Sequence, residues 1–298
     1  VRPIEFKELK KATQNFRPDL ILGEGGFGPV YKGWIDEQTL IASKPGYGMP
    51  VAVKIWDREN KHGHEEVLKE IHYLSQLHHP NLIKLVGYCF EQDNMILVHE
   101  FMPKGSLDNH LFGRHQTLSW ATRIKVAIDA ARALSFLHGK DKPVIHRDFK
   151  TANMLLDGEY NAKLYDFGLA RDMTDDTTRV IGTYVMGTSG YAAPEYVATG
   201  FLTTKCDVYS FGVVVLELLS GRRAIDRNRV GNEQYLTDWA KPYLRNKRQV
   251  SRVMDTRLEG QYSSKKVYAV ANIALQCLSP DPKQRPRMDE VLVALERL

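Results

Sequence analysis

The sequence has few of the features that mark secreted, metal-stapled or membrane-spanning proteins. Only three of its 298 residues are cysteine: Cys89, Cys206 and Cys277. An odd number of widely spaced cysteines fits neither a disulfide framework nor a set of thiolate metal ligands. The longest apolar run, residues 211–219, is far too short to cross a bilayer and contains a glutamate. We therefore expect a protein of a reducing, cytoplasmic compartment.

Export signals and a strong charge of one sign are also absent. No signal peptide opens the chain, and its 41 basic and 36 acidic residues are interspersed, giving a net charge of +5. This mild excess does not predict nucleic-acid binding, although it allows weak attraction to an anionic partner or membrane surface. Because the sequence starts at Val1 and not at Met, we expect a preceding segment, and any membrane anchor would have to lie there.

Hydrophobic patterning divides the chain into a strand-rich first third and a helical remainder. Strand patterns lie at residues 21–22, 30–34, 49–56, 82–90 and 95–101, with one helical pattern at residues 64–77. Helical patterns then dominate at residues 118–138, 204–220, 236–244 and 267–278, around a loop-rich middle at residues 143–200. We expect an α+β protein with an N-terminal extension at residues 1–16, a small β-rich lobe at residues 17–101 and a larger helical lobe at residues 102–298.

A glycine-rich turn, Gly23-Glu24-Gly25-Gly26-Phe27-Gly28, follows the first strand pattern. Glycines let backbone N–H groups approach phosphate oxygens because no Cβ stands in the way. The motif alone is weak, since ordinary tight hairpins and dinucleotide-binding loops share it. A dinucleotide-binding loop opens a helix, however, whereas residues 30–34 continue as a strand pattern. The sequence therefore favours a phosphate-binding turn between two strands.

Lys54 closes a strand pattern, VAVK, one loop after the glycine turn. Most such lysines are simply solvated, but a lysine at this place can reach the α- and β-phosphates of a nucleotide. A lysine on the buried side needs a carboxylate partner. Glu70 shares a helix face with apolar residues 67, 71 and 74. We therefore expect Glu70 to point inward and Glu65 and Glu66 to be solvated.

Two polar clusters in the loop-rich middle suit phosphoryl transfer. They are His146-Arg147-Asp148-Phe149-Lys150-Thr151-Ala152-Asn153 and Asp166-Phe167-Gly168. The reaction needs a base that orients a hydroxyl, cations that gather charge and oxygen ligands that hold Mg²⁺. Asp148 can be the base, Lys54 and Lys150 the cations, and Asn153 and Asp166 the hard oxygen ligands. All four motifs in this order predict a kinase site.

With these motifs in place, the chain resembles the eukaryotic protein kinases over nearly its whole length. More narrowly, it is similar to plant receptor-like kinases of the Pelle/IRAK type, and among these to the receptor-like cytoplasmic kinases that act beside immune and hormone receptors. The narrower resemblance rests on residues 6–16 (FKELKKATQNF), 26–34 (GFGPVYKGW), the insertion at 37–46, 79–88 (HPNLIKLVGY), 207–219 (DVYSFGVVVLELL), 222–226 (RRAID) and 238–244 (DWAKPYL). It implies the bilobal protein kinase fold, with a small antiparallel sheet and one main helix in the first lobe.

The resemblance also implies an activity and a site. The protein would transfer the γ-phosphoryl group of ATP to serine or threonine hydroxyls of protein substrates, with Mg²⁺ as the ion and Mn²⁺ as a substitute. A lysine two positions after the base is the serine/threonine form. The catalytic residues would be Asp148, Lys54, Lys150 and Glu70, and the metal ligands Asn153 and Asp166. The ATP-binding residues would be Leu22, Gly23, Gly25, Gly28, Val30, Ala52, Lys54, Glu100, Met102 and Leu155.

Further contacts are implied by the same resemblance. Glu195 should pair with Arg285, and Asp207 should brace the backbone of His146 and Arg147. Thr188 should bond to Asp148 and Lys150. A hydrophobic column linking the lobes should consist of Leu74, Leu85, His146 and Phe167.

Arg147, directly before the base, marks kinases whose activation loop is controlled by phosphorylation, because an arginine there needs an anion. The loop spans residues 166–195, and we expect phosphorylation at Thr183, Thr178 and Thr177, in this order of preference. His99 occupies the gatekeeper position, where relatives usually have tyrosine. We hypothesise that it gives the pocket behind the nucleotide some pH sensitivity, since histidine can titrate near neutrality.

An alternative to an active kinase is a pseudokinase-like scaffold that binds nucleotide and partners without turnover. The retained Lys54, Asp148, Asn153 and Asp166 favour the active enzyme. A non-kinase nucleotide enzyme would need a Walker loop or a helix after the glycines, and the sequence has neither. By resemblance we expect a monomer that works with a membrane receptor kinase or its complex, at the cytoplasmic face of the plasma membrane, without nucleic acid.

Overall fold

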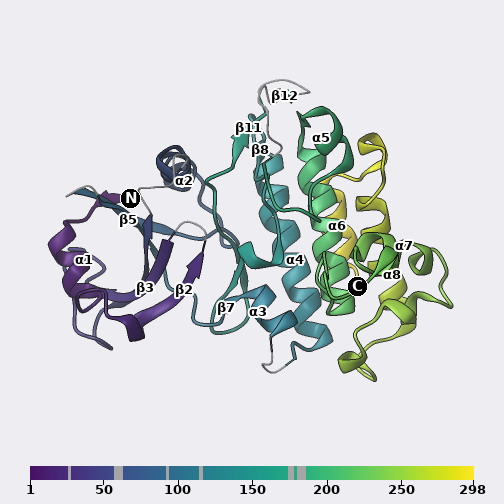
Figure 1. The fold of residues 1–298 in the computed structure, drawn as a ribbon, viewed down its shortest axis with the longest axis horizontal. Coiled ribbons are helices and arrows are strands. Elements are labelled where there is room, and N and C mark those ends of the chain that lie inside the picture. Colours follow the sequence, from purple (N-terminus) through teal and green to yellow (C-terminus); the bar gives the residue numbers. More distant parts are fainter. Residues whose placement is uncertain (26–27, 57–62, 92–93, 114–116, 174–177, 180–185) are drawn as a thin grey trace. The chain divides into compact units, whose positions relative to one another are not determined.

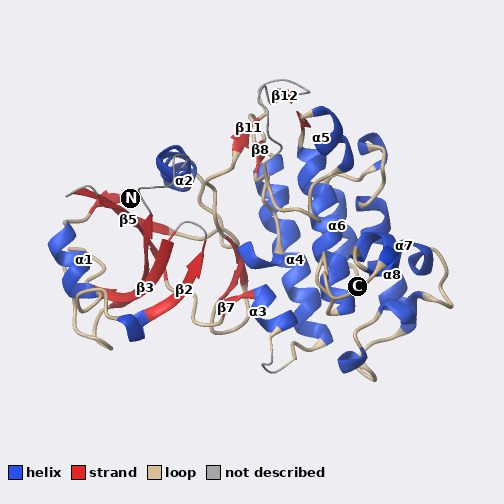
Figure 2. Cartoon of the chain, in the orientation of Figure 1, coloured by secondary structure: helices blue, strands red, loops and turns tan. Residues whose placement is uncertain are grey.

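Seven stretches of the chain are described in a computed structural model of the protein: residues 1–25, 28–56, 63–91, 94–113, 117–173, 178–179 and 186–298. They form two units, Val1–Gly105 and Ser106–Leu298. The first unit is coloured purple to blue in Figure 1 and the second teal to yellow. Most strand residues belong to the first unit, whereas helices dominate the second (Figure 2). The α+β kinase fold expected from the sequence is confirmed.

A six-stranded sheet, with strand order β1-β5-β6-β4-β3-β2, forms the frame of the first unit. Its strands are β1 (Arg2–Pro3), β2 (Ile21–Gly25), β3 (Gly28–Ile35), β4 (Met49–Trp56), β5 (Leu85–Glu91) and β6 (Asn94–Glu100). Neighbouring strands are antiparallel, as predicted, except that β1 runs parallel to β5 with Arg2 opposite Gly87. A Cβ on Gly87 would lie 2.6 Å from the carbonyl oxygen of Arg2, so glycine allows this close approach of the N-terminal strand.

Two helices complete the first unit, α1 (Phe6–Ala12) and α2 (Gly63–Gln76). Leu9 and Ala12 of α1 are buried in one cluster with Ile35 and Val51 of the sheet. Residues three apart lie on one face of a helix, which explains how so short a helix adds to the core. The N-terminal segment, residues 1–16, therefore contributes side chains to the packed core of this unit.

The second unit is centred on α6 (Thr204–Ser220), in which every residue from Cys206 to Ser220 is buried. The helix begins after Thr203, whose hydroxyl accepts a hydrogen bond from the Lys205 N–H at 3.2 Å. It ends at Gly221, whose φ of +63° lies in the left-handed region that glycine adopts without strain. The other helices are α3 (Leu107–Phe112), α4 (Trp120–His138), α5 (Pro194–Thr199), α7 (Leu236–Leu244), α8 (Ser264–Cys277) and α9 (Met288–Glu296).

The chain also contains short strands, of which β7 precedes α3 and the others lie between α4 and α6. They are β7 (Gly105–Ser106), β8 (Val144–Ile145), β9 (Met154–Leu156), β10 (Ala162–Leu164), β11 (Arg171–Asp172), β12 (Thr178–Arg179) and β13 (Phe201–Leu202). In the β9–β10 hairpin Met154 lies opposite Leu164, and one step beyond it the Tyr165 N–H donates to the Asn153 carbonyl at 2.9 Å. This hairpin therefore brings Asn153 and Asp166 to the same end.

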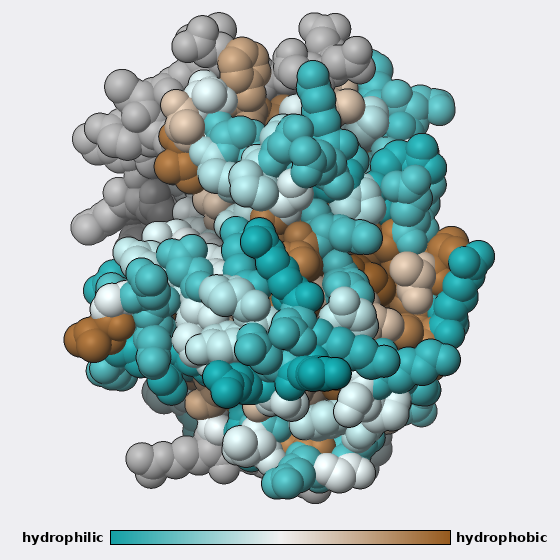
Figure 3. All heavy atoms as spheres, turned by 90° about the vertical axis from the view of Figure 1, so that its right-hand side faces the viewer, coloured by the Kyte–Doolittle hydropathy of each residue, from teal (hydrophilic) through white to brown (hydrophobic). Residues whose placement is uncertain are grey.

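No helix among the described residues combines the length and apolar character that a bilayer crossing requires. Hydrophilic side chains cover most of the face drawn in Figure 3, with hydrophobic residues in smaller groups between them. All three cysteines are free and buried. Burial raises the pKa values of Cys206 and Cys277 to about 12, so these thiols stay protonated at neutral pH.

Candidate active site

In the first unit, three buried side chains from three elements meet around Glu70. Glu70 projects from α2, Lys54 from β4 and His99 from β6, and their exposed fractions are 0 %, 4 % and 2 %. The Lys54 Nζ lies 4.0 Å from Glu70 Oε2, while the His99 Nε2 lies 2.9 Å from Glu70 Oε1. The predicted pairing of Lys54 with Glu70 is thus confirmed as a contact. His99, which the sequence placed at the gatekeeper position, is a second neighbour of the same carboxylate.

Lys54 is further held by its own strand, because its Nζ lies 4.2 Å from the centroid of the Trp56 ring. A cation over an aromatic face is attracted by the ring quadrupole.

The prediction that Glu65 and Glu66 of α2 are both solvated is right for the first and wrong for the second. Glu65 is exposed, but Glu66 is only 7 % exposed. Glu66 precedes Glu70 by one helical turn, and residues four apart share a helix face.

The predicted nucleotide-contacting residues of the first unit lie on adjacent strands. Gly25 and Gly28 face each other across the β2–β3 hairpin, which confirms that the glycine turn joins two strands and does not open a helix. Val30 lies opposite Lys54, and Ala52 lies between Lys32 on one side and His99 on the other. Of the remaining residues, Leu22 and Gly23 are on β2, Glu100 ends β6, Met102 follows it and is buried, and Leu155 is on β9 of the second unit.

In the second unit, short hydrogen bonds surround Asp148. Its Oδ1 accepts from the Thr188 hydroxyl at 2.6 Å, and its Oδ2 accepts from the Lys150 Nζ at 2.7 Å. The Lys150 Nζ also donates to the Thr188 hydroxyl at 2.7 Å. Both contacts predicted for Thr188 are therefore confirmed.

The charge state of Asp148 follows from these partners. Burial alone would raise its pKa, but the Lys150 charge and the hydrogen bonds from Lys150 and Thr188 together lower it below its usual value. Asp148 is therefore an ionised carboxylate at neutral pH, which can accept a proton or a hydrogen bond from a hydroxyl.

Asn153 and Asp166 suit a divalent ion. The Asn153 Nδ2 donates to the Asp148 carbonyl at 2.8 Å and to its carboxylate at 3.2 Å, so this amide turns its nitrogen to Asp148 and its oxygen can serve as a ligand. No cluster of three or more His, Cys, Asp or Glu that could hold a metal was found among the described residues. Mg²⁺ is commonly bound by one or two protein oxygens together with phosphate oxygens and water, whereas zinc takes three or four protein ligands.

The backbone that carries Asp148 is fixed from α6. The Asp207 carboxylate accepts from the N–H groups of His146 and Arg147 at 2.8 and 2.9 Å, which confirms the predicted brace. The same carboxylate lies 2.9 Å from the His138 Nε2 of α4. The His146 and Phe167 rings pack edge to face with centroids 5.1 Å apart. His146 and Phe167 are the members of the predicted hydrophobic column that belong to the second unit. The other two members, Leu74 and Leu85, are buried in the first unit.

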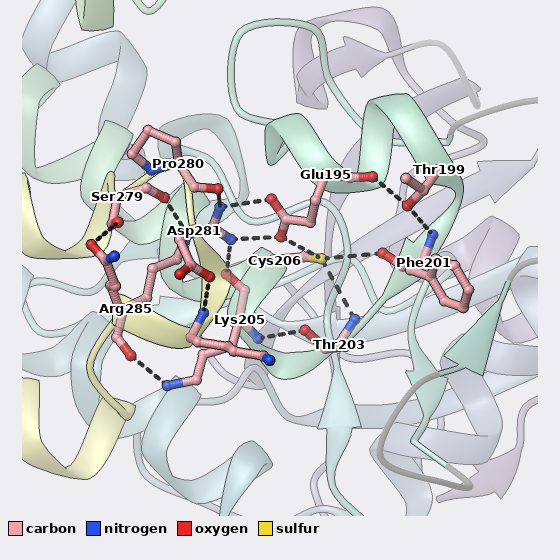
Figure 4. A network of polar contacts seen from close by, with 12 residues as sticks. Glu195, Thr199, Phe201, Thr203, Lys205, Cys206, Ser279, Pro280, Asp281 and Arg285 are labelled. Carbon is pink, nitrogen blue, oxygen red and sulfur yellow. Dashed lines mark hydrogen bonds and ion pairs between the residues drawn. The ribbon is translucent and has the colours of Figure 1, made fainter.

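A second predicted pair anchors the segment after the activation loop. The Arg285 guanidinium donates to both oxygens of Glu195 at 2.6 Å, and only 2 % of Arg285 is exposed. Figure 4 shows this pair, with Cys206 next to Glu195 and Lys205 reaching Arg285. The Cys206 thiol contacts Glu195 Oε1 at 3.7 Å. The bidentate geometry is that of a strong charge-assisted pair, and the predicted partnership is confirmed.

The activation loop is described only in part. Thr183 and Thr177 lie outside the described residues, while Thr178 begins β12, opposite Leu202 of β13. Arg147 donates from Nε and Nη2 to the Tyr196 hydroxyl at 3.0 and 2.9 Å. Its partner among the described residues is thus a neutral phenol and not an anion.

One buried network was not predicted. Glu217, fully buried in α6, accepts from the Tyr191 hydroxyl at 2.8 Å, the Ala224 N–H at 2.8 Å and the Thr151 hydroxyl at 3.1 Å. Burial raises the pKa of Glu217 to about 7, although these three hydrogen bonds act in the opposite direction. The sequence could have indicated this network, because Glu217 lies within the apolar run at residues 211–219 and a buried carboxylate requires hydrogen-bond partners.

Known proteins are similar to this chain along its whole length. Residues 17–295 match a family model described as protein tyrosine and serine/threonine kinase. The probable serine/threonine-protein kinase PBL3 of Arabidopsis thaliana is 63% identical over 300 residues, which cover 100% of this chain and 70% of that protein. PBL2 from the same plant is 61% identical with the same coverage. Receptor-like cytoplasmic kinase 176 of Oryza sativa subsp. japonica is 57% identical over 301 residues, 100% of this chain and 76% of that protein.

Proposed function

The chain belongs to the protein tyrosine and serine/threonine kinase family and is a serine/threonine-protein kinase, and from this premise we propose how its residues divide the work. Asp148 is the catalytic base. Lys150 places positive charge beside the transferred group, and Asn153 and Asp166 hold Mg²⁺. Lys54, paired with Glu70, holds the α- and β-phosphates of ATP, and the nucleotide lies against the residues of β2, β3, β4, β6 and β9 named above.

The observation that carries this proposal is the network around Asp148. Its carboxylate is partly buried, ionised and held from both sides by Thr188 and Lys150. It accepts the proton of a serine or threonine hydroxyl as that oxygen bonds to the γ-phosphorus, the bond from phosphorus to the β–γ bridging oxygen breaks, and ADP leaves. The divalent ion supplies charge neutralisation at the phosphate oxygens. Lys150 contributes a fixed cation close to the base.

Activation-loop phosphorylation is the proposed form of control. Arg147 forms no ion pair in the part of the chain that the structure describes, and its guanidinium is bonded to a neutral hydroxyl. A phosphate on Thr183, Thr178 or Thr177 would offer it a doubly charged partner and so order the loop. The name receptor-like cytoplasmic kinase, given to a relative, supports a place beside a membrane receptor kinase at the cytoplasmic face of the plasma membrane.

Mass spectrometry of the purified protein after incubation with Mg·ATP, beside an Asp148→Asn variant, tests the proposal. We expect phosphate on loop threonines of the parent protein and none on the variant, because asparagine cannot accept the proton. Thr183→Ala should remove the main site. If ATP binds to the parent protein and neither protein gains phosphate, alone or after treatment with an upstream kinase, the pseudokinase-like scaffold replaces the active enzyme.

A further inference from the structure

A groove of about 460 Å³ in the second unit is rich in arginine and shares no residue with the set proposed to bind nucleotide. It is formed by the end of α3, the segment after α6 and the short helix Thr256–Leu258. The charged residues that line it are Arg222, Arg223, Arg229, Arg257, Asp226 and Asp255. The groove therefore has more arginines than carboxylates, and only arginines without a carboxylate partner could bind an added anion.

Both aspartates of the groove form hydrogen bonds with arginines other than Arg222 and Arg223. Asp255 accepts from the buried Arg123 at 2.7 Å and from Arg257 at 2.8 Å. Asp226 accepts from Arg229 at 3.1 Å, and Arg229 also reaches Glu233 at 3.0 Å. The two carboxylates of the groove are thus already bonded to Arg123, Arg257 and Arg229, and none of these contacts involves Arg222 or Arg223.

Arg222 and Arg223 are held by aromatic rings. The Arg222 guanidinium lies 3.7 Å from the centroid of the Trp239 ring and donates to the Glu233 carbonyl at 2.9 Å. The Arg223 guanidinium lies 4.5 Å from the centroid of the Phe112 ring and is exposed. Across the described residues neither forms an ion pair with a carboxylate. Stacking orients a guanidinium and leaves its N–H edge for an anion, so less ordering entropy is lost when one binds.

The arginine segment is joined to the loop that contacts the base. Thr188, which bonds Asp148, lies two residues before Gly190, and a Cβ on Gly190 would lie 2.8 Å from the Ile225 side chain. Tyr191 and the Ala224 N–H both bond to Glu217. Arg223 is therefore followed by Ala224, whose N–H bonds to the same glutamate as Tyr191, and by Ile225, which lies close to Gly190. The arginine segment and the loop that bonds Asp148 are therefore neighbours within the second unit.

We propose that this arginine groove binds acidic side chains of the protein substrate that lie a few residues from the acceptor serine or threonine. The inference rests on the proposed function, because it assigns a substrate class to the same reaction. Carboxylates of aspartate or glutamate match the N–H edges of Arg222 and Arg223 in charge and in bidentate geometry. The occupant is a substrate segment and not a separate partner because Ala224 and Ile225, which follow Arg223, lie against Gly190 of the loop that bonds Asp148.

Matched synthetic peptides test the proposal. Each has one central serine with three glutamates on its N-terminal or C-terminal side, or three glutamines in their place. We expect kcat/KM for one glutamate peptide to exceed that of its glutamine counterpart about tenfold at low salt, and the ratio to fall as ionic strength rises. Arg223→Glu should bring the ratio below one, and the milder Arg223→Gln should give an intermediate ratio.

Arg227→Glu is the matched control, since Arg227 is an exposed arginine of the same segment and does not line the groove. It carries the same charge change and should keep the ratio of the parent protein. Equal rates on glutamate and glutamine peptides would overturn the groove proposal while leaving kinase activity intact. No phosphorylation of any peptide would instead count against the proposed function. An unchanged ratio in Arg223→Glu, together with lost binding to vesicles of anionic lipid, would reassign the groove to a membrane surface.

Discussion

The two units hold their key charged side chains in different ways. In the second unit, Asp148 is fixed by hydrogen bonds of 2.6 and 2.7 Å from Thr188 and Lys150. In the first unit, Lys54 lies 4.0 Å from Glu70, while His99 is 2.9 Å from the other oxygen of the same carboxylate. The base is therefore organised by its own unit, whereas the lysine has a competitor for its partner. This difference points to the first unit as the place where small changes can tune activity.

The largest effect should come from the base. Asp148→Asn keeps the shape of the side chain but loses the charge and the proton-accepting oxygen, so kcat should fall about 10²- to 10⁴-fold. Steady-state kinetics with a peptide substrate measures this, and a melting temperature close to that of the parent protein would show that the fold is intact. A kcat within tenfold of the parent value would contradict the assignment of the base.

Glu217 offers a comparison with Glu70, since both are fully buried carboxylates. The pKa of Glu217 is raised from an ordinary 4.5 to about 7 in the folded state. The folded protein therefore binds more protons than the unfolded chain between these values, and stability falls as the pH rises from about 4.5 to about 7. At about 1.4 kcal/mol per tenfold change in acidity, this loss is about 3 kcal/mol.

Glu217→Gln removes the titration while keeping an acceptor for Tyr191 and the Ala224 N–H. The free energy of unfolding, measured by urea titration from pH 5 to pH 8, should fall less with pH in the variant than in the parent protein. Groups such as histidines titrate in both proteins and cancel in the difference. A difference that stays constant over this range would mean that Glu217 has the same charge in both states.

Thr188 should be a positioning residue for the base. Thr188→Val removes the hydroxyl that bonds both Asp148 and Lys150, and hydrogen bonds to charged groups contribute about 1.5 to 3 kcal/mol. We expect kcat to fall about 10- to 100-fold with little change in KM for ATP, and Thr188→Ser to restore most of it. A valine variant with the kcat of the parent protein would show that Lys150 alone holds the base.

The sequence predicted local features more completely than contacts between distant residues. Spacing on α2 correctly turned Glu70 inward, and strand and helix patterns matched β4, α6 and α7 to the residue. The same spacing also places Glu66, four residues before Glu70, on the inner face of α2, although it was predicted to be solvated. The short helices α1, α3 and α5 were missed, since six or seven residues complete fewer than two turns and show no clear period. The α9 helix was missed as well.

The partners of distant polar groups depend on how loops return to the core. The bonds from Asp207 to the His146 loop and from Arg285 to Glu195 were expected only through family resemblance. Neither the family motifs nor the spacing indicated that Glu217 joins Tyr191 to Ala224, or that His99 contacts Glu70. Such contacts arise from tertiary packing, which a pattern along one element does not contain.

The smallest expected effect comes from His99, and it tests the difference between the two units directly. His99→Leu removes the imidazole that contacts Glu70. Of the two side chains shown beside this carboxylate, only Lys54 then remains polar. The Lys54–Glu70 contact should then shorten, and KM for ATP should fall about two- to fivefold, the size of a modest ion-pair contribution. His99→Gln, which keeps a polar side chain of similar reach, is the control and should lie between the two proteins. A KM that is unchanged in the leucine variant would show that the 4.0 Å separation is set by packing of α2 and not by the histidine.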